Sequence, residues 1–202
     1  MKLYFSPGAC SLAPHIVLRE AALPFSLEQV DLAAHQTANG DDYYAINARG
    51  QVPLLEFDGG ARLTEGPVIA QYIADQATHT GLVPPPGSLA RYRVMEWQNY
   101  VTAELHKSFT PLFNPALDRA AKATLSALLR TKFEWLDARL RDTDFLTGAT
   151  FTIADAYLFV VAGWAGHVGL DLTDLPDLQA YLARVGERPA VRAAMRAEGL
   201  LA

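Results

Sequence analysis

The sequence predicts an α/β domain over residues 1–80, with the element order βαβ-ββα, followed by an all-helical domain over residues 88–202. In the first eighty residues, short apolar runs of strand length alternate with apolar residues at helical spacing. After residue 88 the spacing is helical throughout. Between the two domains lies the segment TGLVPPPG, and consecutive prolines favour an extended spacer. Residues 81–87 are therefore expected to form a stiff linker.

The first predicted elements form a βαβ unit. Lys2 to Phe5 reads as a strand, and the apolar residues that follow recur at helical spacing. Proline is tolerated only in the first turn of a helix, so Pro14 requires this helix to begin near Ser11 or Leu12. Ser26 to Leu32 reads as a second strand. A right-handed crossover with parallel strands is expected.

The rest of the first domain is predicted to be a hairpin and a helix. Residues 54–57 and 61–64 read as two strands that are joined by the tight turn Asp58-Gly59-Gly60. Gly66-Pro67 then places glycine at an N-cap position and proline at the first helical position. We expect a helix over residues 67–77.

The second domain is expected to begin with a helix near Leu89 that has two different faces. One stripe is apolar and suits packing inside a helical bundle. It consists of Trp97, Val101, Leu105 and Leu112. Asn99, Ala103 and His106 follow the spacing i, i+4 and i+7 on roughly the opposite side. This second face is expected to line a cleft or to meet a partner subunit.

A later helix of this domain carries a predicted capping box. Thr152 precedes the apolar run of residues 156–165, and Asp155 stands three positions after Thr152. In such a box the acidic side chain reaches back to the backbone N–H of the cap residue. Asp155 is therefore interpreted as a folding residue of a central core helix.

Composition excludes several classes of function. The formal net charge of −5 provides no basic field for a phosphate backbone, so no nucleic-acid partner is expected. The longest apolar stretch, residues 156–166, is shorter than the about 20 residues that a membrane span needs. His15, His79 and His167 show no ligand-like spacing, so no metal site is expected. With a single cysteine and no signal-peptide pattern, we expect a cytoplasmic protein.

Cys10 is the only cysteine, and it lies between the first strand and the first helix. A thiol at a helix N-terminus faces unpaired backbone N–H groups and the positive end of the helix dipole, which stabilise a thiolate. A lone cysteine can equally be a small buried hydrophobic residue. From the residues alone, both interpretations stay open.

The order of elements, with a cysteine after the first strand and Val52-Pro53 before the third, resembles a thioredoxin-like domain. A narrower resemblance, which covers essentially the whole chain, is to the bacterial beta-class glutathione transferases. Five segments at family spacing carry it: SPGACS at 6–11, GQVP at 50–53, LTEG at 63–66, ELHK at 104–107 and FTIADA at 151–156. The resemblance implies a glutathione transferase architecture, with glutathione as a co-substrate and no prosthetic group.

The resemblance assigns a glutathione-binding role to residues of the first domain. It implies a cis Val52-Pro53 bond, whereas trans is the commoner state of such bonds in general. Val52 would pair through its main chain with the cysteinyl part of glutathione. Glu65 and Gly66 would bind the charged γ-glutamyl end, because an anion docks on free N–H groups at a helix N-terminus. His35 stands where the family often has a lysine that meets the glycine carboxylate.

The resemblance also brings in the second domain. It implies that Asn99 and the segment Ala103, Glu104, Leu105 and His106 reach glutathione, some of them from the other subunit of a homodimer. It makes His106 a partner of Cys10 and of the bound sulfur, so that these two residues are the catalytic candidates.

Three functions follow from these observations. The first is conjugation of glutathione to electrophilic, mostly apolar small molecules, as in detoxification, with Cys10 donating to the bound sulfur or forming a mixed disulfide with it. The second is a monothiol, glutaredoxin-like reductase that uses Cys10 as its nucleophile, since Ala13 occupies the place of a second cysteine. The third is a non-catalytic binding protein of the same fold.

Overall fold

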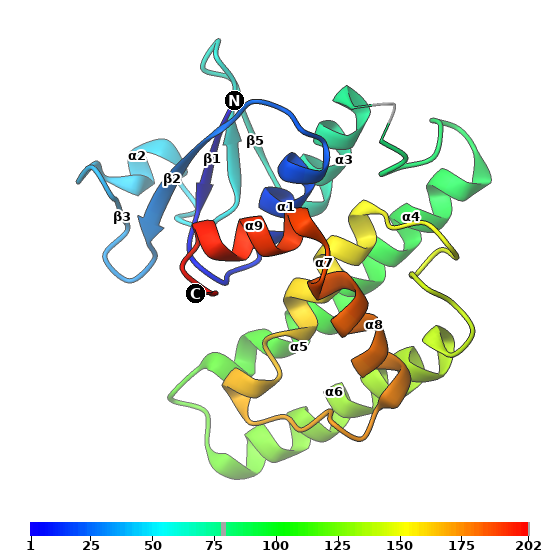
Figure 1. Cartoon of the computed structure of the whole chain (residues 1–202). Helices are drawn as coiled ribbons and strands as arrows, with labels where there is room; N and C mark the ends of the chain where they lie inside the picture. Colours follow the sequence, from blue (N-terminus) through cyan, green and yellow to red (C-terminus); the bar gives the residue numbers. More distant parts are fainter. Residues whose placement is uncertain (78–79, 202) are drawn as a thin grey trace. The chain divides into compact units, whose positions relative to one another are not determined.

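The computed structural model describes residues 1–77 and 80–201, and its contacts divide the chain into two compact units (Figure 1). Unit 1 consists of Met1–Val83 together with Arg188–Ala202, and unit 2 consists of Pro84–Glu187. This differs from the predicted division, in which all of residues 88–202 belonged to the helical domain. The final helix packs with the first unit instead.

Unit 1 is built on a five-stranded mixed sheet. The strands are β1 (Lys2–Phe5), β2 (Ser26–Asp31), β3 (Gln36–Thr37), β4 (Leu54–Glu56) and β5 (Arg62–Thr64), in the order β3-β2-β1-β4-β5. β1 and β2 are parallel, as the βαβ prediction requires, and the other pairs are antiparallel. The predicted α/β fold of the first domain is thus confirmed.

Four helices complete the described part of unit 1. They are α1 (Leu12–Glu20), α2 (Tyr43–Ile46), α3 (Gly66–Gln76) and α9 (Pro189–Ala197). Figure 1 shows α9 beside α1, and α1 contacts both α3 and α9. An ion pair reinforces the position of α9, because Arg188 Nε and Nη2 lie 2.6 and 3.0 Å from the carboxylate oxygens of Glu20. The sequence could not place α9, because helical periodicity indicates that one face of a helix is buried but does not indicate which neighbouring element covers it.

The core of unit 1 follows the alternation of side chains along the strands. In β1, Leu3 and Phe5 point to one side of the sheet and Tyr4 points to the other, and all three are buried. Tyr4 belongs to a cluster that includes Tyr43 of α2 and Val52. The segment that leads into β4 is therefore anchored in the core by a side chain, while its backbone remains available for hydrogen bonds.

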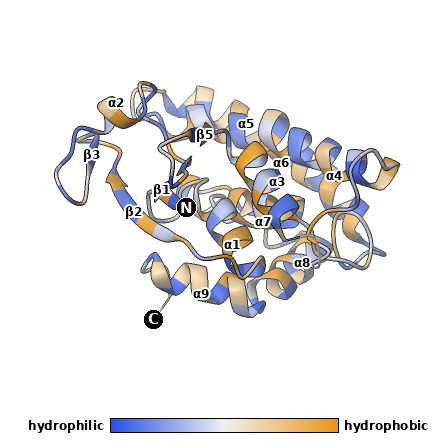
Figure 2. Ribbon diagram, turned by 90° about the horizontal axis from the view of Figure 1, so that it is seen from above, coloured by the Kyte–Doolittle hydropathy of each residue, from blue (hydrophilic) through white to orange (hydrophobic). Residues whose placement is uncertain are grey.

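Unit 2 is helical. Its elements are α4 (Leu89–Tyr100), η1 (Val101–His106), α5 (Lys107–Phe109), η2 (Thr110–Phe113), α6 (Arg119–Leu140), α7 (Ile153–Ala162), η3 (Gly166–Val168) and α8 (Pro176–Gly186). Hydrophobic and hydrophilic residues alternate along α4 and α6 (Figure 2), whereas α7 is buried along almost its whole length. The predicted helical domain is confirmed. None of the helices in the described parts of the chain has the length and hydropathy of a membrane span.

The predicted α-helical spacing around His106 needs a correction, because η1 is a π-helix. The Lys107 N–H donates to the carbonyl of Thr102, five residues earlier. A π turn contains more residues than an α turn, so residues after it are rotated relative to those before it. Asn99, Ala103 and His106 consequently do not share one face by the i, i+4, i+7 rule. Val101 and Leu105 are nevertheless fully buried, as the apolar stripe predicted.

Asp155, at the start of α7, makes more hydrogen bonds than the predicted capping box. Its Oδ2 accepts from the backbone N and the hydroxyl of Thr152, at 2.8 and 2.9 Å. Its Oδ1 accepts from the backbone N of Leu146 at 2.8 Å and from the hydroxyl of Tyr181 at 3.0 Å. The side chain is fully buried, and this burial raises the pKa of Asp155. One carboxylate therefore joins three segments of unit 2.

Candidate functional site

Cys10 lies immediately before α1, whose N-cap residue is Ser11. The thiol donates a hydrogen bond to the carbonyl oxygen of Val52, with an Sγ–O distance of 3.3 Å. The sequence left open whether the helix N-terminus stabilises a thiolate here or Cys10 is a small buried residue. The observed bond uses the proton of the thiol and ties Cys10 to the main chain at Val52.

The loop that carries Cys10 is held by the C-terminal segment of the chain. The carboxylate of Glu198 accepts from the Gly8 backbone N at 3.0 Å and pairs with His15 Nδ1 at 2.8 Å. The side chains of His15 and Glu198 are both fully buried. Arg19 Nε completes the row by donating to His15 Nε2 at 2.9 Å. Nothing in the sequence signals this network, because His15 and Glu198 are 183 positions apart.

The Val52-Pro53 peptide bond is cis, as the resemblance implied. The preceding segment is fixed from α2, because the Tyr43 hydroxyl and the Asn47 amide both donate to the carbonyl of Gln51, at 3.0 and 2.6 Å. Burial raises the pKa of Tyr43 to about 12, so this hydroxyl remains a donor at any physiological pH. The main chain at Val52 is therefore rigidly placed beside the thiol.

Glu65 has a backbone conformation that non-glycine residues seldom adopt, with a φ of 69°. It is the N-cap residue of α3, one position earlier than the Gly66 cap that the sequence predicted, and Gly66 is the first helical residue. The Glu65 carboxylate pairs with Arg49 Nη1 at 2.8 Å, while Arg49 Nη2 donates to the Thr64 hydroxyl at 2.8 Å. Sequence reasoning did not single out Arg49.

His35 lies against the same segment of chain. Its Nε2 is 3.0 Å from the Tyr44 hydroxyl, and the two rings stack with centroids 4.2 Å apart. Its Nδ1 is buried and makes no hydrogen bond among the described residues. A Cβ at Gly50 would lie 2.7 Å from Tyr44 and 2.8 Å from this nitrogen, so glycine is required there. Within unit 1, the Nε2 of His35 is therefore bonded to Tyr44, and its Nδ1 is buried next to Gly50.

Residues 47–53 bring the predicted residues of unit 1 together. Each of the four other predicted residues contacts a different position of this segment, although they come from different elements. The contacts are Arg49 with Glu65, Gly50 with His35, Val52 with Cys10, and Pro53 with Gly66. The segment offers backbone groups beside a thiol and beside the N-terminus of α3. This combination suits a peptide-like ligand with a charged end.

In unit 2, His106 is the last residue of the π turn and is held by aromatic residues. Its Nδ1 lies 2.6 Å from the Tyr157 hydroxyl, and its ring packs edge-on against Tyr157 and Trp164. Trp164 in turn packs edge-on against Phe113, which is half exposed. Sequence reasoning did not connect Tyr157 or Trp164 with His106.

The other predicted residues of unit 2 differ in what they can offer a ligand. The Leu105 side chain is fully buried, so only its backbone is available for a contact. Asn99, Ala103 and Glu104 are exposed. Glu104 forms an ion pair with Lys132, at 2.8 Å.

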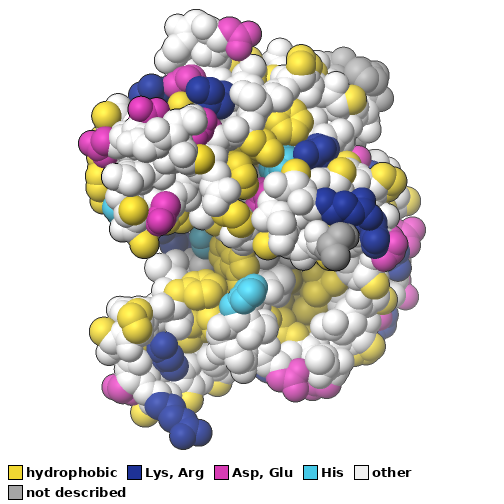
Figure 3. Space-filling view, turned by 60° about the vertical axis from the view of Figure 1, so that its left-hand side comes forward, with side chains coloured by type: hydrophobic (Ala, Val, Ile, Leu, Met, Phe, Trp, Pro, Cys, Tyr) yellow, Lys and Arg dark blue, Asp and Glu magenta, His cyan; other side chains and the backbone are white. Residues whose placement is uncertain are grey.

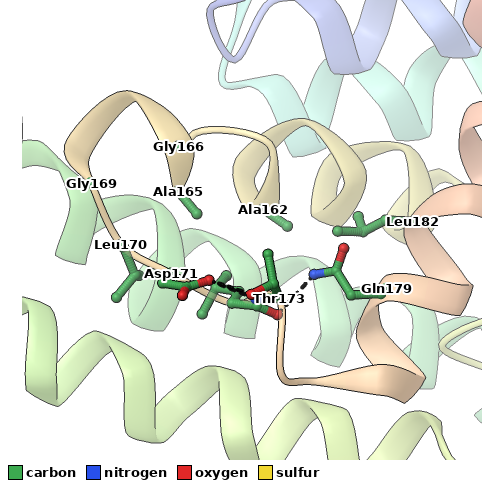
Figure 4. A pocket seen from close by; sticks show the side chains of 10 residues that line it. Ala162, Ala165, Gly166, Gly169, Leu170, Asp171, Thr173, Gln179 and Leu182 are labelled. Carbon is green, nitrogen blue, oxygen red and sulfur yellow. Dashed lines mark hydrogen bonds between the residues drawn. The ribbon is translucent and has the colours of Figure 1, made fainter.

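Unit 2 also contains a cavity of about 430 Å³ at the C-terminal end of α7 (Figure 4). None of the predicted site residues lines it. Its apolar wall includes Ala162 and Ala165, and the polar side chains at its rim are already hydrogen-bonded. Asp171 accepts from Thr173, and the Gln179 amide donates to the Leu172 carbonyl.

The described residues contain no group of three or more histidine, cysteine, aspartate or glutamate side chains that could hold a metal ion. His79 lies outside the described residues. On the face drawn in Figure 3, lysine and arginine side chains lie among aspartate and glutamate side chains.

Comparison with known proteins identifies the family. Residues 8–76 match the family model "Glutathione S-transferase, N-terminal domain", and residues 115–184 match "Glutathione S-transferase, C-terminal domain". The chain belongs to the glutathione S-transferase family. A curated relative, the glutathione S-transferase GstA of Escherichia coli O157:H7, is 48% identical over 200 residues, which cover 99% of this chain and all of GstA.

Solved structures agree with this assignment. A ternary complex of BphK, a bacterial glutathione S-transferase, is 52% identical with a TM-score of 0.96, over 99% of this chain and all of that one. The beta-class enzyme of Sphingomonas chungbukensis is 46% identical with a TM-score of 0.96, over the whole of both chains. A sphingomonad glutathione S-transferase complexed with glutathione is 46% identical with a TM-score of 0.95, over 99% of this chain and all of that one.

The resemblance to the bacterial beta class is therefore confirmed across the whole chain. The chain is a glutathione transferase with the thioredoxin-like and helical domains of that family. Glutathione is a substrate of such enzymes rather than a prosthetic group.

Proposed function

We propose that this glutathione transferase joins the sulfur of glutathione to electrophilic, mostly apolar small molecules. The convergence of Cys10, His35, Glu65 and Gly66 on residues 47–53 is the observation that carries the proposal. It offers complementary groups to each part of a tripeptide. The solved complex of the sphingomonad relative with glutathione supports the same ligand.

Glutathione would lie along residues 47–53. The backbone of Val52 would pair with the cysteinyl residue of glutathione, in the manner of an added strand. A carbonyl oxygen has two lone pairs, so the Val52 carbonyl can accept from glutathione and still accept from Cys10. The first N–H groups of α3 would bind the γ-glutamyl carboxylate, and Glu65 would bind the neighbouring amino group. Arg49 holds the Glu65 carboxylate in place for this contact.

Cys10 and His106 would act on the sulfur. When glutathione binds, the Cys10 thiol would turn its single proton from the Val52 carbonyl to the glutathione thiolate and thereby stabilise it. His106 would take the proton as the thiol ionises, so the S–H bond breaks and an N–H bond forms. The thiolate then attacks the electrophile, and binding supplies most of the orientation. As the resemblance implies, Asn99 and Ala103 to His106 would complete the glutathione site.

Monothiol reduction is the second candidate function, and the position of Cys10 beside the Val52 backbone favours it. In this reaction the Cys10 thiolate attacks the sulfur of a glutathione mixed disulfide. A disulfide with Cys10 forms, and the other thiolate leaves. A second glutathione then reduces that disulfide, because Ala13 replaces the second cysteine of a dithiol pair.

The wider setting completes the proposal. We infer a cytoplasmic homodimer with a role in detoxification, in which some of the contacts of Asn99 and residues 103–106 with glutathione come from the second subunit. Light scattering after gel filtration tests the dimer, because a monomeric mass in the micromolar range would contradict it.

A comparison of Cys10→Ala with the parent protein tests the chemistry. The Cys10→Ala variant should conjugate glutathione to an aryl halide more slowly, because the donor to the thiolate is lost, and it should lose reduction of a glutathione mixed disulfide entirely. Thr124→Ala removes an exposed hydroxyl of α6 and serves as the control for both assays. If the parent protein neither binds immobilised glutathione nor turns over either substrate, the proposed function is wrong and a binding role is favoured.

A further inference from the structure

His106 is connected to α7 by the short hydrogen bond from its Nδ1 to the Tyr157 hydroxyl, at 2.6 Å. The Tyr157 side chain is 5% exposed, and α7 is a core helix that is anchored by Asp155. A buried phenol needs a hydrogen-bond partner, and this bond supplies one. The imidazole is therefore attached to one of the most rigid parts of unit 2.

We propose that Tyr157 is a positioning residue for His106 in the conjugation reaction. This inference rests on the proposed function, in which His106 takes the thiol proton. Because Nδ1 is committed to Tyr157, exchange of that proton falls to Nε2. With the tyrosine hydroxyl accepting from Nδ1–H, the neutral ring would carry its proton on Nδ1, and Nε2 would have the lone pair of a base. After proton transfer, the same Nδ1–H continues to donate to Tyr157.

The aromatic contacts fix the plane of the imidazole as well as its hydrogen bond. The His106 ring is nearly perpendicular to Trp164, at 75° with centroids 4.8 Å apart, and to Tyr157, at 78° and 5.9 Å. Edge-to-face arrangements of this kind are preferred by aromatic rings. Rotation of the imidazole would break two ring contacts and one hydrogen bond together.

The π turn provides independent support, since it determines where the His106 side chain points. η1 packs on α7, and its extra residue changes the direction of His106 relative to α4. Lys132 supports this turn, because its Nζ donates to the Glu104 carbonyl at 2.9 Å and to the Ser108 hydroxyl at 3.0 Å. π turns occur frequently at functional sites. Here the unusual turn directs His106 toward Tyr157.

Tyr157→Phe tests the inference, because it removes the hydroxyl and keeps the ring. We expect kcat/KM for conjugation of an aryl halide to fall about tenfold, the equivalent of one lost hydrogen bond. The KM for glutathione should change less than about twofold, and the pH profile of kcat/KM should be displaced by about half a unit or more. Tyr100→Phe is the matched control. Its hydroxyl makes only a 3.4 Å contact with the Lys132 carbonyl, so its kinetics should equal the parent's.

The double variant separates this inference from the proposed function. If Tyr157 acts through His106, then Tyr157→Phe should cause no further loss of rate in the His106→Ala background. Equal losses in both backgrounds, or an unchanged pH profile in the single variant, would overturn the positioning role. If His106→Ala itself leaves the rate unchanged, the assignment of His106 in the proposed function fails first.

Discussion

The two units fix their predicted functional residues in different ways. In unit 1, the proposed site consists largely of main-chain groups, including the Val52 carbonyl and the N-terminus of α3, and residues 47–53 hold these groups together. In unit 2, the proposed site is a side chain, His106, that contacts Tyr157 and Trp164 at the end of a π turn. A main-chain site suits a ligand that is itself a peptide. A side-chain site suits a proton transfer and depends on distant neighbours.

The largest expected effect tests how far unit 2 depends on buried polar contacts. Asp155→Ala removes the acceptor of the Leu146 and Thr152 N–H groups, and it leaves the Tyr181 hydroxyl only its longer, 3.3 Å bond to the backbone carbonyl of Asp155. We expect a loss of about 3 kcal/mol or more in the free energy of unfolding, measured with urea, since each buried unsatisfied donor costs about 1–3 kcal/mol. This exceeds the 0.5 to 2 kcal/mol expected of a simple cap.

Asp118→Ala is the control for that measurement. Asp118 is an exposed N-cap residue whose side chain accepts from Ala121 N at 2.8 Å, so its loss should cost only about 1 kcal/mol. Equal losses for the two variants would mean that the buried contacts of Asp155 contribute no more than a surface cap.

The next effect tests whether the main-chain site of unit 1 also needs a buried side chain. Glu198→Gln weakens the contacts with His15 and with the Gly8 N–H in the loop before Cys10. We expect a loss of about 2 kcal/mol in stability, together with weaker glutathione binding by calorimetry. Glu96→Gln, which alters an exposed pair with Arg93, should cost less than about 1 kcal/mol. Unchanged glutathione binding in Glu198→Gln would separate the network from the site.

A smaller effect, on glutathione binding, is expected when His35→Lys adds a positive charge in unit 1. At about pH 8 histidine as a residue type is mostly neutral and lysine is charged, so His35→Lys should bind glutathione about fivefold more tightly. Tyr44→Phe is the control, because it removes the partner of His35 Nε2 without adding a charge. Equal affinities of the parent and His35→Lys at this pH would contradict a contact with the glycine carboxylate.

The smallest effect tests the helix N-terminus. A Cβ at Gly66 would lie 3.6 Å from Pro53 Cγ, which is an ordinary van der Waals distance, so Gly66→Ser fits without strain. Its hydroxyl can donate to the γ-glutamyl carboxylate, and we expect about threefold tighter binding of glutathione. Gly66→Ala adds the Cβ alone and should leave the affinity unchanged. If Gly66→Ser and Gly66→Ala both bind glutathione more tightly, the higher helix propensity of the new residues explains the gain, and the hydroxyl does not.

The sequence predicted local structure well where a residue constrains its own neighbourhood. Pro14 fixed the start of α1 to within one residue, and the Asp58-Gly59-Gly60 turn marked the hairpin of β4 and β5. The cis state of Val52-Pro53 was available only through the resemblance. The N-cap of α3 was misplaced by one residue, because the unusual φ of Glu65 has no local signature.

By itself, the sequence determined the order of strands and helices, the parallel βαβ unit, the position of Cys10 before α1 and the capping residue of α7. Each of these depends on the chemistry of residues a few positions apart. Only the tertiary structure decided that α9 packs on α1, that Glu198 holds the loop before Cys10, and that Tyr157 orients His106 across a π turn. These contacts join residues that are 51 to 190 positions apart, and periodicity shows that a side chain is buried without showing which partner it meets.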